Sequence, residues 1–179
     1  MRSGKWTPTM GSLLATKTVG LIGVGRIGSA VAKLAQAFGA RVIGFDPVVS
    51  SHSSVELLSL DEVLNQADIV SLHVPINDQT HHIMNANTIS RMKPGSIVVN
   101  VSRGGLIDES ALHDALKSQH LSGAALDCFE DEPYSGPLLQ IPGVHVTAHM
   151  GSYARETRDL MEVEASTNLV NGLRKRGLI

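Results

Sequence analysis

The sequence predicts an α/β fold in which helices pack on a doubly wound parallel sheet of the Rossmann type. Short apolar runs alternate with segments of helical periodicity along almost the whole chain. Buried parallel strands form continuous apolar runs and need crossover helices between them, so this alternation favours a parallel sheet with right-handed crossovers. A glycine-rich turn after the first strand and an acid at the end of the second strand support the same fold.

The glycine-rich turn lies between a strand expected at 19–22 and a helix that runs to about residue 38. In a G-x-G-x-x-G turn, Gly23 permits the tight bend, Gly25 lets the backbone approach a pyrophosphate, and Gly28 lets helix and strand pack closely. The N–H groups at the start of the helix attract the same pyrophosphate, and Arg26 can contact a phosphate oxygen. The turn therefore predicts a dinucleotide site.

The helix after the turn is expected to bury one apolar face and to end at Gly39 in a left-handed cap. The residues predicted on that face are Ile27, Ala30, Val31, Leu34, Ala35 and Phe38.

Asp46 follows the second strand, expected at 41–45. A carboxylate at this place accepts hydrogen bonds from an adenosine ribose, and its charge repels a 2′-phosphate. Residues 47–50 include no cation that would offset the repulsion. The sequence therefore favours NAD over NADP.

The later elements continue the alternation. Ser59 and Asp108 are predicted helix N-caps, and Ser59 forms a capping box with Glu62. The long last helix is expected to carry Met161, Ala165, Leu169 and Leu173 on one face. Further strands are expected at 68–73, 96–101, 124–127 and 145–147, and helices at 59–66, 87–92, 108–117 and from about 154. Residues 1–16 are predicted to be an N-terminal arm, and 17–179 one dinucleotide-binding domain with a C-terminal helix.

Composition excludes several classes of function. A net charge of −2 and few aromatic residues argue against a nucleic-acid-binding face. The eight histidines lack metal-ligand spacing, so we predict no metal site and interpret His81 and His82 as part of a solvated loop. The single cysteine, Cys128, indicates a reducing compartment, and neither a membrane-spanning run nor a signal peptide is seen. We therefore expect a cytoplasmic protein.

Polar residues follow one predicted strand after another. Because ligands of such sheets bind beyond the carboxyl ends of the strands, we expect these residues to lie around one site. They are Asp46, His73, Asn100, Arg103, Asp127, Glu132 and His149.

Four motifs resemble the D-isomer-specific 2-hydroxyacid dehydrogenases, a family that includes phosphoglycerate dehydrogenases and glyoxylate or hydroxypyruvate reductases. They are HVP at 73–75, NVSRGGLIDESAL at 100–112, ALDCFEDEP at 125–133 and TAHMGS at 147–152. Cys128 and Ala148 depart from the valine and proline that the family usually has. The resemblance implies an NAD-dependent oxidoreductase that transfers hydride between nicotinamide and a 2-hydroxy or 2-keto acid.

By this resemblance, Arg103, Glu132 and His149 take the catalytic positions. His149 would exchange the proton, Glu132 would orient its imidazole, and Arg103 would bind the substrate carboxylate. The implied cofactor contacts are Gly23, Gly25, Arg26, Ile27, Gly28, Asp46, His73, Val74, Pro75, Val101, Ser102, Arg103, Asp127, His149, Gly151 and Ser152.

The resemblance also implies that the substrate domain is largely absent from this sequence, because family members build most of it from an N-terminal segment. We therefore expect NAD binding with weak or no turnover by this chain alone. The family forms homodimers through the nucleotide-binding domain, with an arm near Trp6 reaching over the partner, so a homodimer is expected.

Two alternatives stay open. An NAD-sensing binding module resembling the C-terminal-binding corepressors would keep the same arginine, glutamate and histidine. A methyltransferase that uses S-adenosylmethionine can have a similar glycine turn, but it would not need Arg103, Glu132 and His149. Glu132 disfavours the formate dehydrogenase branch, which usually has glutamine there.

Overall fold

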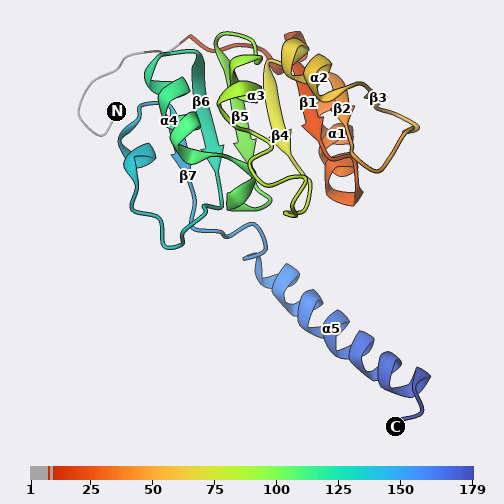
Figure 1. The fold of residues 1–179 in the computed structure, drawn as a ribbon. Coiled ribbons are helices and arrows are strands. Elements are labelled where there is room, and N and C mark those ends of the chain that lie inside the picture. Colours follow the sequence, from red (N-terminus) through yellow and green to blue (C-terminus); the bar gives the residue numbers. More distant parts are fainter. Residues whose placement is uncertain (1–7, 9) are drawn as a thin grey trace. The chain divides into compact units, whose positions relative to one another are not determined.

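A computed structural model describes residue 8 and residues 10–179. The chain forms two compact units, Met1–Thr147 and Ala148–Ile179 (Figure 1). The second unit contains one long helix, α5 (Arg155–Lys175). The predicted arm around Trp6 lies outside the described residues.

The first unit alternates strands and helices as predicted. Its elements are η1 (Leu14–Thr16), β1 (Thr18–Ile22), α1 (Arg26–Ala37), β2 (Arg41–Phe45), β3 (Glu56–Leu57), α2 (Leu60–Gln66), β4 (Ile69–Leu72), α3 (Ala86–Ser90), β5 (Ser96–Asn100), η2 (Gly104–Leu106), α4 (Glu109–Lys117), β6 (Leu121–Leu126), η3 (Pro137–Gln140) and β7 (Val144–Val146).

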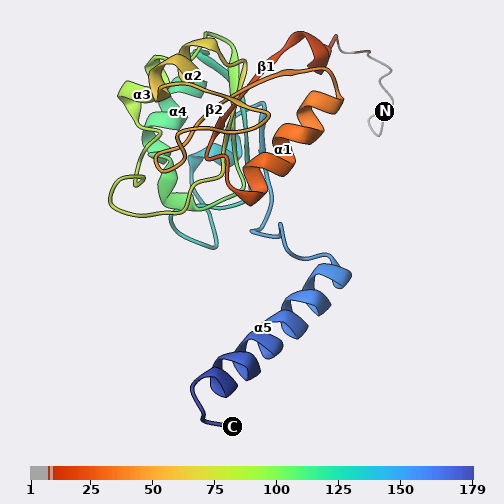
Figure 2. The ribbon, with the colours of Figure 1, turned by 90° about the vertical axis from the view of Figure 1, so that its right-hand side faces the viewer.

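The strands form one parallel sheet in the order β3-β2-β1-β4-β5-β6-β7, which confirms the predicted fold class. The order reverses between β1 and β4, so the loops after these two strands diverge and leave room for a ligand. Figure 2 shows α1 on one side of the sheet and α2, α3 and α4 on the other. Each side has its own apolar core: Leu21 packs on the side of α1, and the next residue, Ile22, on the side of the other three helices.

The predicted buried face of α1 is largely wrong. Gly28, Ala32 and Ala35 are buried against the sheet, and Val31 is half-buried. Ala30 is exposed, and three larger side chains are mostly in solvent: Ile27 is 68% exposed, Leu34 64% and Phe38 69%. The helix packs so closely on the strands that only small side chains fit between them. The periodicity of apolar residues predicted that one face of α1 is buried, but the size of the side chains determines which residues lie on that face.

Local signals gave most other boundaries within a few residues. Ser59 caps α2 in a capping box with Glu62, and Asp108 accepts hydrogen bonds from Ser110 N and Ala111 N at the start of α4. Gly39 has φ +85°, as its predicted left-handed conformation requires. Strand β3, whose two residues pair with Ile43 and Gly44, was not predicted.

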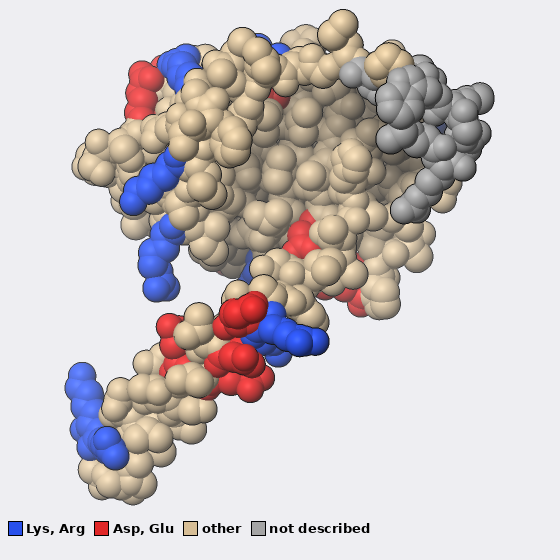
Figure 3. Space-filling model, turned by 180° about the vertical axis from the view of Figure 1, so that it is seen from behind, with Lys and Arg blue, Asp and Glu red and all other residues tan. Residues whose placement is uncertain are grey.

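Helix α5 makes up most of the second unit. Acidic side chains cluster in its first half, and it ends on Arg174 and Lys175, which suits the helix dipole (Figure 3). Of the four residues predicted on one face, Met161, Ala165 and Leu169 are exposed and Leu173 is half-buried. Within the described residues, no helix is long and apolar enough to span a membrane.

Candidate functional site

The glycine turn after β1 has the geometry of a tight, closely packed bend. Gly23 has φ +100°, and a Cβ there would lie 2.7 Å from the carbonyl carbon and oxygen of His73. A Cβ on Gly28 would lie 2.1 Å from the carbonyl oxygen of Gly23. Gly25 differs, because a Cβ built on it meets no atom within 4 Å. The backbone of Gly25 therefore faces open space.

That open space lies at the N-terminus of α1. Gly25 is the N-cap, and among the described residues no side chain caps this helix end. Free N–H groups in the first turn suit a phosphate, and Arg26, the exposed first residue of the helix, adds a cation. The turn therefore fits a dinucleotide pyrophosphate.

Asp46 binds the backbone around the turn. Its Oδ2 accepts a hydrogen bond from Val24 N at 2.9 Å, and its Oδ1 accepts from Val48 N and Val49 N at 2.9 and 3.0 Å. Burial raises the pKa of Asp46, but the three N–H donors outweigh this and hold the pKa below its usual value. An ionised carboxylate has about four acceptor positions, so one is left for a ribose hydroxyl.

His52 also lies near the turn, although it was not predicted as a site residue. Its Nε2 lies 3.0 Å from Ser29 Oγ, which donates a hydrogen bond to Val24 O, beside the turn. His52 comes from the irregular loop between β2 and β3, where no periodicity or motif marks it.

His73 directly follows β4 and is half-buried. Burial lowers its pKa, so the imidazole is neutral at pH 7, with Nε2 2.9 Å from Ser71 Oγ. Val74 is buried, and its carbonyl accepts a hydrogen bond from Ser102 Oγ at 2.8 Å. The ends of β4 and β5 are therefore tied together.

Asn100 shapes the loop that carries Arg103. The side chain of Asn100, which is 1% exposed, donates to Arg103 O at 2.8 Å and accepts from Ser102 N at 3.1 Å. Gly104 packs so tightly that a Cβ would lie 1.9 Å from the carbonyl of Phe129. The loop backbone is thus fixed while the Arg103 side chain is exposed, with Nη1 donating to Ser102 O.

The segment after β6 carries Asp127 and Glu132. Asp127 is buried, and its Oδ1 accepts from Thr147 Oγ1 at 2.5 Å. Glu132 is exposed, and its Oε1 accepts from Phe129 N at 3.0 Å. Cys128 lies between these two acids in the sequence. Burial raises the pKa of its thiol to about 11, and the negative charges of Asp127 and Glu132 contribute to the increase. Its thiol is therefore neutral at pH 7.

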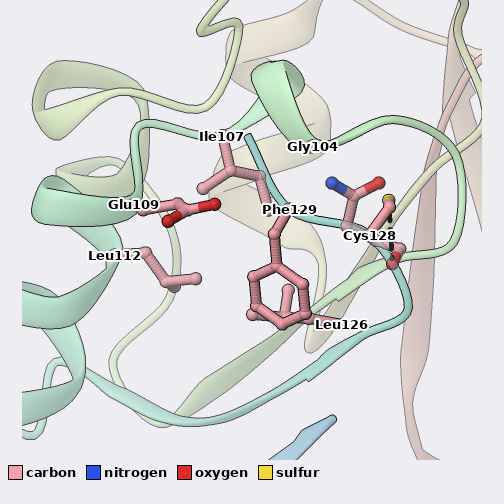
Figure 4. Close-up of a pocket in the computed structure, with 8 residues that line it drawn as sticks. Gly104, Ile107, Glu109, Leu112, Leu126, Cys128 and Phe129 are labelled. Carbon is pink, nitrogen blue, oxygen red and sulfur yellow. Dashed lines mark hydrogen bonds between the residues drawn. The ribbon is translucent and has the colours of Figure 1, made fainter. Parts of the chain in front are cut away.

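A pocket behind the Arg103 loop is packed core and not a ligand site (Figure 4). Its empty volume is about 170 Å³, shared among closely packed side chains. Glu109 points into it, and burial raises the pKa of this carboxyl, whose Oε1 accepts from Glu130 N at 2.8 Å. The lining residues are Asn100, Gly104, Ile107, Glu109, Leu112, Leu126, Cys128 and Phe129.

The predicted site residues fall into two groups. Those from Gly23 to Glu132 lie in the first unit. There, Asp46, His73, Arg103 and Asp127 follow the parallel strands β2, β4, β5 and β6, so all four lie at the carboxyl ends of the sheet. His149, Gly151 and Ser152 belong to the second unit, in the segment before α5. There, His149 is exposed, with φ +49°.

Comparison with known proteins places the chain in a family. Residues 1–151 match the family model described as D-isomer specific 2-hydroxyacid dehydrogenase, NAD binding domain. The D-3-phosphoglycerate dehydrogenase of Mycobacterium tuberculosis is 41% identical over an alignment of 169 residues, and the match covers 92% of this chain and 31% of that protein. The glyoxylate reductase of Korarchaeum cryptofilum is 38% identical over 182 residues, covering 95% of this chain and 55% of that protein.

Solved structures that are similar to this chain include members of the same family. The D-lactate dehydrogenase from Aquifex aeolicus, complexed with NAD and lactic acid, has a TM-score of 0.85 at 32% identity, covering 99% of this chain and 59% of that one. Similar structures include complexes with NAD and with NADPH. The chain spans about a third to three-fifths of these relatives. It belongs to the D-isomer-specific 2-hydroxyacid dehydrogenase family, and its residues 1–151 correspond to the NAD-binding domain of that family.

Proposed function

We propose that this chain supplies the NAD-binding and hydride-transfer half of an oxidoreductase that acts on 2-hydroxy and 2-keto acids. The observation that carries the proposal is the uncapped N-terminus of α1 behind the open backbone of Gly25, with Asp46 at the end of the next strand. Phosphates and a ribose are the groups that such an arrangement binds.

Bound NAD would supply the hydride chemistry, and the chain would position the substrate and move a proton. Arg103 presents a fork of donors suited to a carboxylate and a neighbouring keto oxygen. His149 is the proposed proton donor and acceptor, and Glu132 is the proposed acidic catalytic residue. Asp127, fixed by Thr147, is proposed to face the nicotinamide end of the cofactor.

The cofactor half of the proposal is tested by titrating the chain with NADH and NADPH in a calorimeter. We expect NADH to bind at least about tenfold more tightly, because the ionised Asp46 repels a 2′-phosphate. Asp46→Asn removes the charge and should narrow this difference, whereas Asp114→Asn, on the exposed face of α4, should not. Equal affinities for both cofactors in the unmodified chain would refute the role of Asp46.

An NAD-sensing binding module is the second candidate, because it would use the same cofactor site. Because that module would keep Arg103, Glu132 and His149, these residues do not separate the two candidates. Turnover of 2-keto acids by the chain completed with the segments that it lacks relative to its relatives would favour the enzyme.

Self-association is proposed through α1. The exposed side chains of Ile27, Leu34 and Phe38 form an apolar stripe along this helix, which a second copy of the chain could cover. We predict a homodimer in sedimentation at tens of micromolar (a range of ~10⁻⁵ M affinities), and a monomer for Leu34→Glu. Lys33→Glu, its neighbour in sequence, is the matched control. A monomeric unmodified chain would contradict this assignment.

The cytoplasmic location stays a prediction.

A further inference from the structure

His81, His82 and Glu130 form a cluster that the proposed hydride transfer does not use. The two histidines lie in the loop between β4 and α3, and Glu130 lies after β6. His82 Nε2 is 2.8 Å from Glu130 Oε1, and His81 Nε2 is 3.6 Å from the same oxygen. One ligand atom from each residue lies within 4.8 Å of the other two. Three donors thus converge on one point.

The backbone holds both parts of the cluster. His82 has φ +49°, its N–H donates to Gly105 O at 2.8 Å, and its carbonyl accepts from Asn85 Nδ2 at 2.9 Å. On the other side, Glu130 N donates to Glu109 Oε1 at 2.8 Å. Because these bonds fix the two segments, small side-chain rotations are enough to bring the three donor atoms around one ion.

The side chains are accessible but not freely mobile. The imidazole rings stack at 3.9 Å with an angle of 26° between their planes, so both present Nε2 to the same carboxylate. The side chain of His81 is 54% exposed, that of Glu130 42% and that of His82 32%. A hydrated ion can reach all three.

The donor types select the ion. Two imidazole nitrogens and one carboxylate suit zinc and its neighbours, whereas magnesium and calcium prefer oxygen ligands throughout. Zinc binds such donors at about 2.0–2.1 Å and accepts three protein ligands with a water in the fourth position. The nearby carboxylates of Glu109 and Asp131 add negative charge, which favours a cation.

We propose that His81, His82 and Glu130 form a binding site for a divalent transition metal ion, with zinc as the best fit. The site abuts the loop of Arg103: a Cβ on Gly105 would lie 3.5 Å from His81 Cδ2. Because His82 N–H also bonds Gly105 O, a bound ion would restrain residues 103–107 as well as its own ligands.

The test is a titration of the metal-free chain with ZnCl₂, followed by competition with a chromophoric chelator. We expect one equivalent to bind, and His81→Asn, His82→Asn and Glu130→Gln each to weaken binding at least about tenfold. His113→Asn is the matched control, because His113 pairs with Asp114 at 3.3 Å and, among the described residues, belongs to no group of three candidate metal ligands. It should bind zinc like the unmodified chain.

A second measurement covers the case in which a variant folds poorly. Hydrogen exchange in peptides spanning 80–86 and 103–108 should slow when zinc is added to the unmodified chain, but not when MgCl₂ is added. The proposal is overturned if zinc binds the three variants as tightly as the unmodified chain, if magnesium binds equally well, or if zinc leaves exchange in both peptides unchanged.

Discussion

Gly28→Ala should destabilise the first unit severely, whereas Gly25→Ala should leave it folded and abolish most NAD binding. At Gly28 the added methyl group would meet the backbone oxygen of Gly23 at 2.1 Å, so helix and turn must move apart. We expect the free energy of unfolding to fall by at least about 2–3 kcal/mol, as for a severely overpacked core. At a size of 150–250 residues this lowers the melting temperature by roughly 5–10 °C.

At Gly25 the same methyl group meets no protein atom within 4 Å, and φ is −64°. Stability should therefore change by less than about 0.5 kcal/mol. The methyl group would instead occupy the space that a pyrophosphate needs, so the affinity for NADH should fall at least about tenfold.

Thermal melts and NADH fluorescence titrations measure both effects. Gly11→Ala is the control, since a Cβ there also meets nothing within 4 Å and lies before β1. If Gly25→Ala bound NADH as tightly as the unmodified chain, the turn would not be the cofactor site.

The 179-residue chain assayed alone should reduce 2-keto acids at least about 10³-fold more slowly than a chimaera that adds the remaining segments of the Aquifex aeolicus D-lactate dehydrogenase. In the described structure Arg103 is exposed to solvent, which screens its charge. Holding a substrate in place against a cofactor can be worth ~7–11 kcal/mol of barrier. Recovering about 4 kcal/mol of that is enough to account for a 10³-fold difference in rate.

The assay follows NADH absorbance with glyoxylate, hydroxypyruvate and pyruvate. Arg103→Lys in the chimaera should lose most of the activity, because lysine lacks the planar fork of donors. Turnover by the chain alone that equals that of the chimaera would contradict the prediction. A chimaera that binds NADH but reduces none of the three acids would favour the NAD-sensing module.

The sequence predicted this fold well because its local signals are strong. The alternation of elements, the capping box at Ser59 and the cap at Asp108 depend on residues close together in the chain. By contrast, β3 is only two residues long and is defined by its pairing with β2, which no local pattern encodes. The face of α1 was misassigned because periodicity does not report how closely a helix approaches its sheet.

For the site, the rule that ligands bind at the carboxyl ends of parallel strands was enough to place Asp46, His73, Arg103 and Asp127 at one edge. It could not reveal the cluster of His81, His82 and Glu130, because the histidines and the glutamate come from separate segments after different strands. The resulting contact depends on the paths of two irregular loops, and no spacing in the sequence anticipates it.

The short outer strands of the sheet have a consequence for behaviour at high concentration. β3 has two residues and β7 has three, and these are the two ends of the strand order. A long outer strand offers a row of unpaired N–H and C=O groups on which another chain can add as a β-strand, the first step toward cross-β fibrils. Outer strands this short give an incoming segment too few partners to hold it, so the sheet itself resists fibril growth.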